Sequence, residues 1–202
     1  MAQNRLMQDL KCSVNYDNLV KTVERFPGVL EGSRDVFQKV RDFAFSEVGK
    51  SEGLGVGGIH GDFWTGNILL PRDLHQKSGT TATLFVTDWE LTQCGPRALD
   101  LGQMIAELYE LKLFKGIDAG LWIIQAFVEE YRSRSTLSVD VAFRTAIHVG
   151  VHLVAWGSTV PGWGSAEQIE DVVRVGRDLV VKGWEKDRKW FEESDLRCLF
   201  VE

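Results

Sequence analysis

Two short segments of the chain carry carboxylate, amide and imidazole side chains at close spacing. The first covers residues 60–67 and reads HGDFWTGN, and the second covers residues 88–90 and reads DWE. Carboxylate and amide oxygens are the ligands that Mg²⁺ prefers, and a carboxylate can also take a proton from a hydroxyl group. These residue types therefore favour a site that holds a hard cation beside a general base.

A short hairpin is needed to bring the two segments together. Residues 68–70 and 84–86 read ILL and LFV, which is typical of strands. In an antiparallel pair, the start of one strand lies beside the end of the other. We therefore expect Asn67, at the start of the first strand, and Asp88, just after the second, to share the cation. Asp62 is then free to act as the base.

These segments resemble a known family. HGDFWTGN is similar to the catalytic loop H-x-D-x-x-x-x-N of the aminoglycoside phosphotransferases and choline kinases, which have a protein-kinase-like fold. Residues 86–90, VTDWE, resemble the metal-binding element of that family, and residues 95–102, GPRALDLG, resemble the stretch that follows it. The three matches occur in the family's order. The resemblance extends from about residue 16 to the C-terminus and is greatest to fungal members.

The resemblance implies transfer of phosphate from ATP to the hydroxyl group of a small molecule. Asp62 would orient that hydroxyl and accept its proton, while Asn67 and Asp88 would hold Mg²⁺ on the phosphates of ATP. The residues that would bind the rest of the nucleotide stay unassigned.

Three further residues complete the expected site. His60, which belongs to the catalytic loop, is expected to brace that loop rather than react. Asp100 is expected to support the same loop from a helix. Glu90 is assigned to a second metal ion, although many family members carry the shorter Asp at this position. The alternative is that all these polar residues cap turns in a kinase-like lobe that no longer transfers phosphate.

The N-terminal lobe of the kinase-like fold has no counterpart in the sequence. Only 59 residues precede His60, and they read as helices without a strand that carries an apolar-flanked Lys. Residues 53–58 spell G-x-G-x-x-G, but they follow a helix and lead into the catalytic loop, which indicates a connector. We expect the C-terminal lobe alone, with its uncovered face buried by a homodimer, a partner chain or a segment folded over it.

The fold class expected is mostly α with a small β-hairpin, that is, α+β. One domain covers residues 1–202, with leading helices and a glycine-rich connector (1–58), catalytic and metal loops with the hairpin (59–102), and a helical substrate-side subdomain (103–202). Apolar periodicity predicts helices over about 17–25, 33–48, 99–113, 121–131, 138–161 and 165–190. Ser165 and Gln168 form a capping-box pattern at the start of the last helix.

Composition excludes some classes of function. A net charge of −6, without a basic tract, argues against nucleic-acid binding, and no apolar run reaches membrane-spanning length. The three widely spaced Cys residues form neither a disulfide framework nor a metal knuckle, which favours a reducing, cytoplasmic location. Acidic residues of the helical half are suited to attracting a cationic small-molecule substrate.

Several residues have a simpler interpretation as packing residues. His148 and His152 lie at i, i+4 among apolar neighbours, and no Glu follows His148 as in a zinc motif. Core packing is therefore the prediction for both, and also for most of Trp156, Trp163, Trp184 and Trp190. A different class of function also stays open: a truncated lobe reused for acid–base chemistry with Asp62, His60 and Asp88, or for binding and scaffolding.

Overall fold

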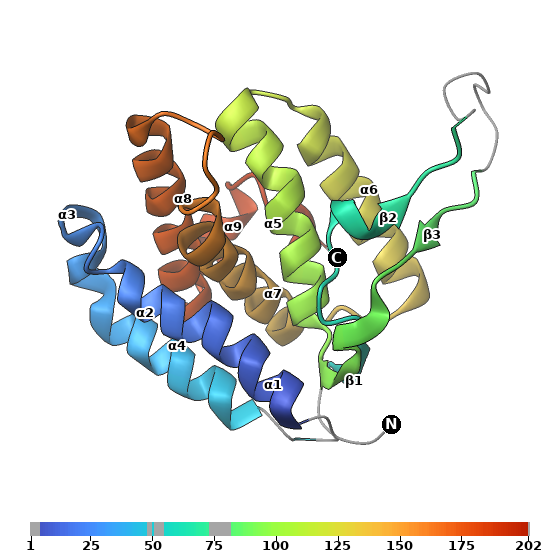
Figure 1. The fold of residues 1–202 in the computed structure, drawn as a ribbon, viewed down its shortest axis with the longest axis horizontal. Helices are drawn as coiled ribbons and strands as arrows, with labels where there is room; N and C mark the ends of the chain where they lie inside the picture. Colours follow the sequence, from blue (N-terminus) through green and yellow to red (C-terminus); the bar gives the residue numbers. More distant parts are fainter. Residues whose placement is uncertain (1–4, 48–49, 51–54, 73–81, 202) are drawn as a thin grey trace.

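The structure is a computed structural model that describes residues 5–47, 50, 55–72 and 82–201 (Figure 1). Within these ranges the chain is mostly helical and contains two small two-stranded sheets. The sequence prediction of a mostly α protein with a small hairpin is thus confirmed. No helix among the described residues is both long and apolar enough to cross a membrane.

The N-terminal helices form a layer against the rest of the molecule. This layer comprises α1 (Arg5–Cys12), a π-helical turn (Ser13–Asp17), α2 (Asn18–Thr22), α3 (Pro27–Leu30) and α4 (Arg34–Glu47). Cys12, Tyr16, Leu19 and Val23 recur every three or four residues and are buried, so one apolar stripe faces the core. The helical stretch predicted over 17–25 therefore begins much earlier, at Arg5.

The C-terminal helices pack around a central helix. They are α5 (Ala98–Lys115), α6 (Ala119–Arg134), α7 (Val139–His152), α8 (Ala166–Glu185) and α9 (Arg188–Glu192). Residues 141–152 of α7 are all buried, because α5 and α8 cover it from two sides. Gly150 makes the α7–α8 approach possible, since a Cβ there would lie 2.5 Å from the carbonyl oxygen of Gly176. Figure 1 shows α7 in the middle of these helices.

The start of α8 agrees with the sequence pattern, but its end does not. Ser165 Oγ accepts from the N–H of Gln168 at 3.2 Å, and Gln168 Oε1 accepts from the N–H of Ser165 at 3.0 Å. This reciprocal capping box satisfies two otherwise unpaired backbone donors. The helix predicted to run toward residue 190 ends at Glu185, because Lys186 adopts a left-handed conformation with φ of 54°.

The predicted hairpin is present, although each strand is short. Strand β2 (Ile68–Leu69) pairs antiparallel with β3 (Phe85–Val86), with Ile68 opposite Val86. Most of the turn expected over 71–80 lies outside the described residues.

A second sheet was not predicted. Strand β1 (Val56–Ile59) pairs antiparallel with β4 (Gln93–Pro96), whereas residues 49–58 were expected to form a loop. The prediction was wrong for residues 56–58, because glycine is depleted in strands and the run therefore read as a connector. Residues 53 and 54 of the glycine motif lie outside the described part of the chain. Residues 56–58 of the motif belong to β1, and this strand leads into the loop at residues 60–67 rather than directly into a helix.

Candidate functional site

The loop between β1 and β2 is held in place by Asp100, in the first turn of α5. Asp100 Oδ2 accepts from the backbone N–H of His60 at 2.6 Å, and Oδ1 accepts from that of Gly61 at 3.0 Å. Burial raises the pKa of the Asp100 carboxyl, while these two hydrogen bonds and the charge of Lys11 act in the opposite direction. Asp100 therefore anchors the loop backbone to the start of α5.

Gly61 lets the loop turn back on itself. Its φ is +88°, and a Cβ at this position would lie 2.3 Å from the carbonyl oxygen of Leu91. Any other residue would meet both backbone strain and a clash with main chain. The close approach places the loop directly against the residues that follow Asp88.

His60 connects the loop to the end of β3. Its Nδ1 accepts from the N–H of Asp62 at 3.2 Å, and its Nε2 lies 2.8 Å from the carbonyl oxygen of Thr87. Because a carbonyl can only accept, these partners fix the neutral tautomer with the proton on Nε2. The ring also lies 4.6 Å from the Trp89 ring, centroid to centroid. Both ring nitrogens are engaged, so the geometry supports a bracing role.

Asp62 has one engaged and one nearly free carboxylate oxygen. Its Oδ1 accepts from Nε2 of Gln103 at 2.6 Å. Nδ2 of Asn67 donates to the backbone carbonyl of Asp62 at 2.9 Å but lies 3.5 Å from Oδ2, at the limit of a hydrogen bond. Oδ2 is thus the oxygen left to accept a proton from a ligand.

Asn67 and Asp88 lie at the same end of the β2–β3 hairpin. The N–H of Thr87, the residue before Asp88, donates to the carbonyl oxygen of Asn67 at 3.0 Å. Because Nδ2 of Asn67 binds the Asp62 carbonyl, its side-chain oxygen is left for a ligand. Asp88 is exposed and adopts a left-handed conformation with φ of 66°. Such strain at a non-glycine residue is typical of functional sites.

The oxygen donors fit Mg²⁺ only with help from a ligand. Among the described residues, no three His, Cys, Asp or Glu side chains lie close enough to hold a metal by themselves. The side chains of Asp88 and Glu90 make no hydrogen bond or ion pair to the described part of the chain, and both residues are exposed. Two protein oxygens beside an open space suit Mg²⁺, which usually takes its remaining ligands from substrate phosphates and water.

A pocket of about 590 Å³ opens at Asp62. It lies between the loop at residues 60–67, α1, α5 and the end of α7. Its walls carry three Trp rings and several charged or polar side chains: Trp64, Trp156, Trp163, Lys11, Asp62, Gln103, Glu107, Glu110 and His152. The pocket therefore combines aromatic surface with a carboxylate-rich wall, and it reaches the oxygen expected to act as base.

The inner wall of this pocket contains a carboxyl group without a partner. Glu110 is 2% exposed, and its Oε1 makes no hydrogen bond within the described residues. Burial, together with the nearby charge of Glu107, raises the pKa of Glu110 to about 8. Glu107 itself lies 3.1 Å from Nε2 of His152. A buried acceptor without a donor points to a cationic ligand or a proton at this place.

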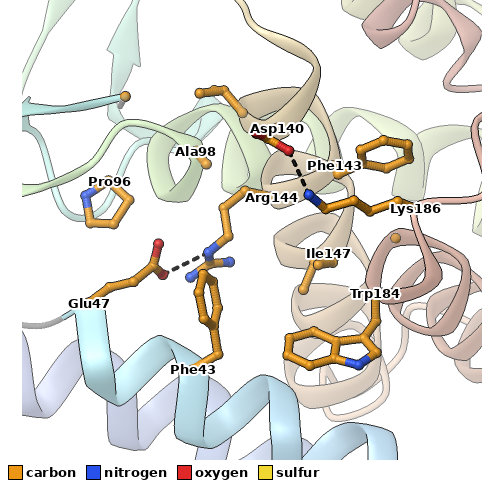
Figure 2. A pocket seen from close by; sticks show the side chains of 13 residues that line it. Phe43, Glu47, Pro96, Ala98, Asp140, Phe143, Arg144, Ile147, Trp184 and Lys186 are labelled. Atoms are coloured by element: carbon orange, nitrogen blue, oxygen red, sulfur yellow. Dashed lines mark hydrogen bonds and ion pairs between the residues drawn. The ribbon is translucent and has the colours of Figure 1, made fainter. Parts of the chain in front are cut away.

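A second pocket, of about 490 Å³, lies apart from the motif residues (Figure 2). The ends of α4, α7 and α8 surround it, and its charged side chains are paired with each other. Arg144 Nε donates to Glu47 Oε2 at 2.8 Å, and Lys186 Nζ donates to Asp140 Oδ1 at 2.7 Å. None of the six residues proposed from sequence lines this second pocket. The pocket at Asp62 is therefore the better candidate for chemistry.

Sequence reasoning found the loop residues but missed the pocket wall. On α5, Gln103, Glu107 and Glu110 are spaced four and three residues apart, which places them on one helix face. That polar stripe on an apolar helix was a usable signal. His148 is fully buried and bonded to the Tyr16 hydroxyl at 2.9 Å, as packing predicted, whereas His152 lines the pocket.

The Trp residues divide between packing and the pocket. Trp184 and Trp190 are partly buried against the apolar core, as predicted. Trp163 packs against the core and also lines the pocket, and Trp156 lines it while 40% exposed. Trp156 Nε1 donates to Asn15 Oδ1 at 3.1 Å, which fixes the ring against the N-terminal helical layer.

The chain is similar to fungal proteins named for phosphate transfer. It is 36% identical over 204 residues to phosphotransferase FrzJ of Cladobotryum sp, a match that covers 98% of this chain and 51% of FrzJ. It is 32% identical over 118 residues to the 4-hydroxytryptamine kinase of Psilocybe cubensis, covering 58% of this chain and 32% of that kinase. The corresponding kinase of Psilocybe cyanescens is 31% identical over 130 residues, covering 64% and 35%.

The chain therefore spans about half the length of FrzJ and about a third of each kinase. No protein-family model matches it. The names of these relatives support a phosphotransferase family and a phosphate-transfer function.

Proposed function

We propose that this chain is the catalytic-loop lobe of a kinase-like phosphotransferase that transfers phosphate from ATP to the hydroxyl group of a small molecule. The observation that carries the proposal is the position of Asp62. Its Oδ2 is nearly free, it lines a pocket of about 590 Å³, and it is hydrogen-bonded to Asn67 at the end of the hairpin. These contacts support a base that lines the substrate pocket and lies close to an oxygen proposed to bind the metal.

The chemistry assigned to Asp62 is general base catalysis. The substrate hydroxyl would donate its proton to Oδ2, and the hydroxyl oxygen would form a bond to the γ-phosphorus of ATP. The bond between that phosphorus and the β–γ bridging oxygen would break, and ADP would leave with the electron pair. Gln103 holds Oδ1 and so keeps Oδ2 turned to the pocket. Orientation of this kind is the main contribution that a protein makes to phosphoryl transfer.

Asn67 and Asp88 are the residues proposed to hold Mg²⁺, with Glu90 available for a second ion. When bound, Mg²⁺ neutralises negative charge that develops on the phosphates. The protein side chains supply two or three oxygens from one turn of chain, so ATP phosphates would complete the coordination. This division of ligands explains why no protein cluster of three His, Cys, Asp or Glu is found in the described residues.

The pocket favours a hydroxylated aromatic amine as the substrate. Two relatives are named as kinases of 4-hydroxytryptamine, which carries a hydroxyl group on an aromatic ring and an amine. Trp64, Trp156 and Trp163 offer faces for a ring, and a protonated amine is attracted by such faces and by carboxylates. Glu110 supplies a buried oxygen that lacks a donor. An ammonium group beside it would satisfy that oxygen.

The alternative function, a reused lobe that binds a partner, is favoured by a different observation. Around the hairpin, the apolar side chains of Leu69, Leu70, Leu84, Phe85 and Trp89 are each more than half exposed. A second copy or a partner chain would bury them. Such a partner would cover the same face that a nucleotide-binding lobe would cover. Burial of this face therefore does not distinguish the two functions, and the transfer of phosphate does.

The test is a transfer assay at high protein concentration. The chain is incubated with millimolar ATP, Mg²⁺ and 4-hydroxytryptamine, and phosphorylated product is quantified by ³¹P NMR and mass spectrometry. We expect product that requires Mg²⁺ and is lost in the Asp62→Asn variant. The matched control Asp171→Asn changes an exposed carboxylate on α8 that lies 3.9 Å from Arg174, and it should retain activity. Equal product from Asp62→Asn would contradict the role of Asp62. Binding of the amine without any product would support the reused lobe instead.

A further inference from the structure

We infer that Lys11, on α1 and outside both motifs, is a positioning residue that orients the Asp62 carboxylate through the side chain of Gln103. The inference rests on the proposed role of Asp62 as the base. It assigns to the N-terminal helix a part in the chemistry that the catalytic loop alone does not suggest.

Two short hydrogen bonds in series connect the three side chains. Lys11 Nζ donates to Gln103 Oε1 at 2.6 Å, and Gln103 Nε2 donates to Asp62 Oδ1 at 2.6 Å. Lys11 is 9% exposed and Gln103 is 6% exposed, so water competes little for either bond. A hydrogen bond with an ionised partner is shorter and stronger than a neutral one, and each bond here has a charged group at one end. The series therefore joins an ammonium to a carboxylate through one amide.

The amide of Gln103 needs Lys11 to face the right way. A Gln side chain has an accepting oxygen and a donating nitrogen, and rotation of the amide would present the oxygen to the Asp62 carboxylate. Lysine ammonium only donates, so it selects the orientation in which Oε1 points to α1. Nε2 must then point to Asp62. Oδ1 is held by this contact, and Oδ2 is left for the substrate hydroxyl.

Burial of the Lys11 ammonium lowers the stability of the folded protein, so a role beyond packing is needed to account for a lysine at this position. Burial lowers the pKa of Lys11, while the carboxylates of Asp100 and Asp62 act in the opposite direction. Its hydrogen bond goes to a neutral amide rather than directly to either carboxylate. Burying an ammonium without a direct ion pair is unfavourable, and an apolar residue of similar length would fill the space at lower cost. Stability alone thus gives a poor reason for a lysine here.

Helix α1 is well placed to hold Lys11 still. Gln8 Nε2 donates to the carbonyl oxygen of Cys94 at 3.0 Å, which ties α1 to strand β4. Asn15 Nδ2 donates to the carbonyl oxygen of Lys11 at 2.8 Å, and Cys12 is buried beside Ala44 of α4. The lysine therefore extends from a fixed backbone into the wall of the pocket that Asp62 also lines.

The first experiment needs no catalytic activity. The side-chain amide of Gln103 is observed in ¹⁵N–¹H spectra and assigned by its loss in Gln103→Leu. In the unaltered chain we expect one amide proton shifted strongly downfield by the short bond to the carboxylate. Lys11→Met and Asp62→Asn should each remove that shift, while Lys21→Met, on an exposed lysine of α2, should leave it. A shift that persists in Lys11→Met overturns the inference.

The second experiment uses the transfer assay. Lys11→Met and Gln103→Leu should each lower kcat by about 10- to 100-fold, the effect of a misplaced catalytic group, with KM changed by less than about threefold. The double variant should be no worse than the poorer single variant, because both changes break one series of contacts. Additive losses, or an effect confined to KM, would contradict a positioning role.

A rescue experiment separates positioning from folding. Lys11→Ala leaves room for a small amine, and ethylammonium in the buffer should restore both the Gln103 amide shift and part of kcat. Melting curves show whether each variant folds. If Lys11→Met does not fold, Lys11→Ala with ethylammonium is used in its place. Restored folding without a restored amide shift would assign Lys11 to stability only. If the unaltered chain transfers no phosphate, the proposed function fails, while the amide shift still decides the inference on Lys11.

Discussion

At the scale of single residues, the proposed site depends on groups whose partners are fixed by the surrounding backbone. His60 uses both ring nitrogens, and Asp100 uses both carboxylate oxygens, on main-chain groups of adjoining segments. Asp62 differs from both, because one of its oxygens stays nearly free. Glu110 differs again, since it is buried in the pocket without a donor. Chemistry and ligand binding are thus expected at the residues whose hydrogen bonding is incomplete.

The buried carboxyl of Glu110 predicts how stability changes with pH. Its pKa is raised from 4.5 to about 8, so the folded state holds a proton that the unfolded state has already lost between these values. The contribution to stability is complete below pH 4.5 and is lost as the pH rises through about 8. Glu110→Gln keeps the shape without the titration. We expect it to be more stable than the unaltered chain by about 1–3 kcal/mol at pH 8, with a smaller difference at pH 5.

The measurement is urea denaturation at pH 5, 6.5 and 8. Glu107 is the carboxylate next to Glu110, and it contacts His152. The Glu107→Gln variant therefore shows how stability responds to the loss of a nearby negative charge. An unchanged pH dependence in Glu110→Gln would mean that Glu110 is ionised in the folded protein.

Gly61 gives a second prediction at this scale. Gly61→Ala should destabilise the protein by about 2 kcal/mol or more, because the backbone has φ of +88° and the new Cβ would meet the carbonyl oxygen of Leu91. Gly28→Ala, in α3, is the matched control, since no atom lies within 4 Å of its added Cβ. Denaturation midpoints of the two variants compare them directly. A Gly61→Ala protein as stable as Gly28→Ala would contradict the loop geometry.

At the scale of elements, the features that depend on a local sequence pattern were predicted, whereas pairings between distant segments were not. The hairpin and the capping box at Ser165 depend on residues close in sequence, and both are present. The β1–β4 pairing joins residues 56–59 to 93–96, and no local pattern marks it in a glycine run. The contact of Lys11 with the pocket wall was missed for a similar reason. Lys11 and Gln103 are 92 residues apart, so only the folded structure shows that these two side chains meet.

The contact between α7 and the N-terminal helices gives an element-scale prediction. Arg144 donates to Glu47 Oε2 at 2.8 Å (Figure 2). It also donates to the Tyr16 hydroxyl at 2.8 Å, so it joins α7 to α4 and to the π-helical turn after α1. Arg144→Met should cost about 3–5 kcal/mol, because Glu47 is left largely buried and unpaired. The double variant Arg144→Met with Glu47→Met should recover part of this loss. Urea denaturation of the single and double variants gives the coupling, and an additive result would rule out a significant ion pair.

At the scale of the whole molecule, the described residues combine a helical core with a group of exposed apolar side chains at the hairpin. The side chains of this hairpin patch are 52–59% exposed, and they are Leu69, Leu70, Leu84, Phe85 and Trp89. The patch directly adjoins Asp88, so whatever covers it lies next to the proposed phosphate site. The proposal that the chain is the C-terminal lobe of a kinase-like fold predicts such a face, because a nucleotide-binding lobe would pack there.

The hairpin patch predicts self-association of the isolated chain. Large apolar side chains that gather on one face of a soluble protein commonly mark an interface, and two copies of the patch would shield each other. Light scattering coupled to size-exclusion chromatography should therefore give a mass that rises above 22.8 kDa as the protein concentration increases. The double variant Leu70→Ser with Phe85→Ser should return the mass to that of the monomer. Trp122→Ser is the matched control, since Trp122 is 70% exposed on α6 and lies outside the patch. A chain that stays monomeric at every concentration would show that two copies of the patch do not pair.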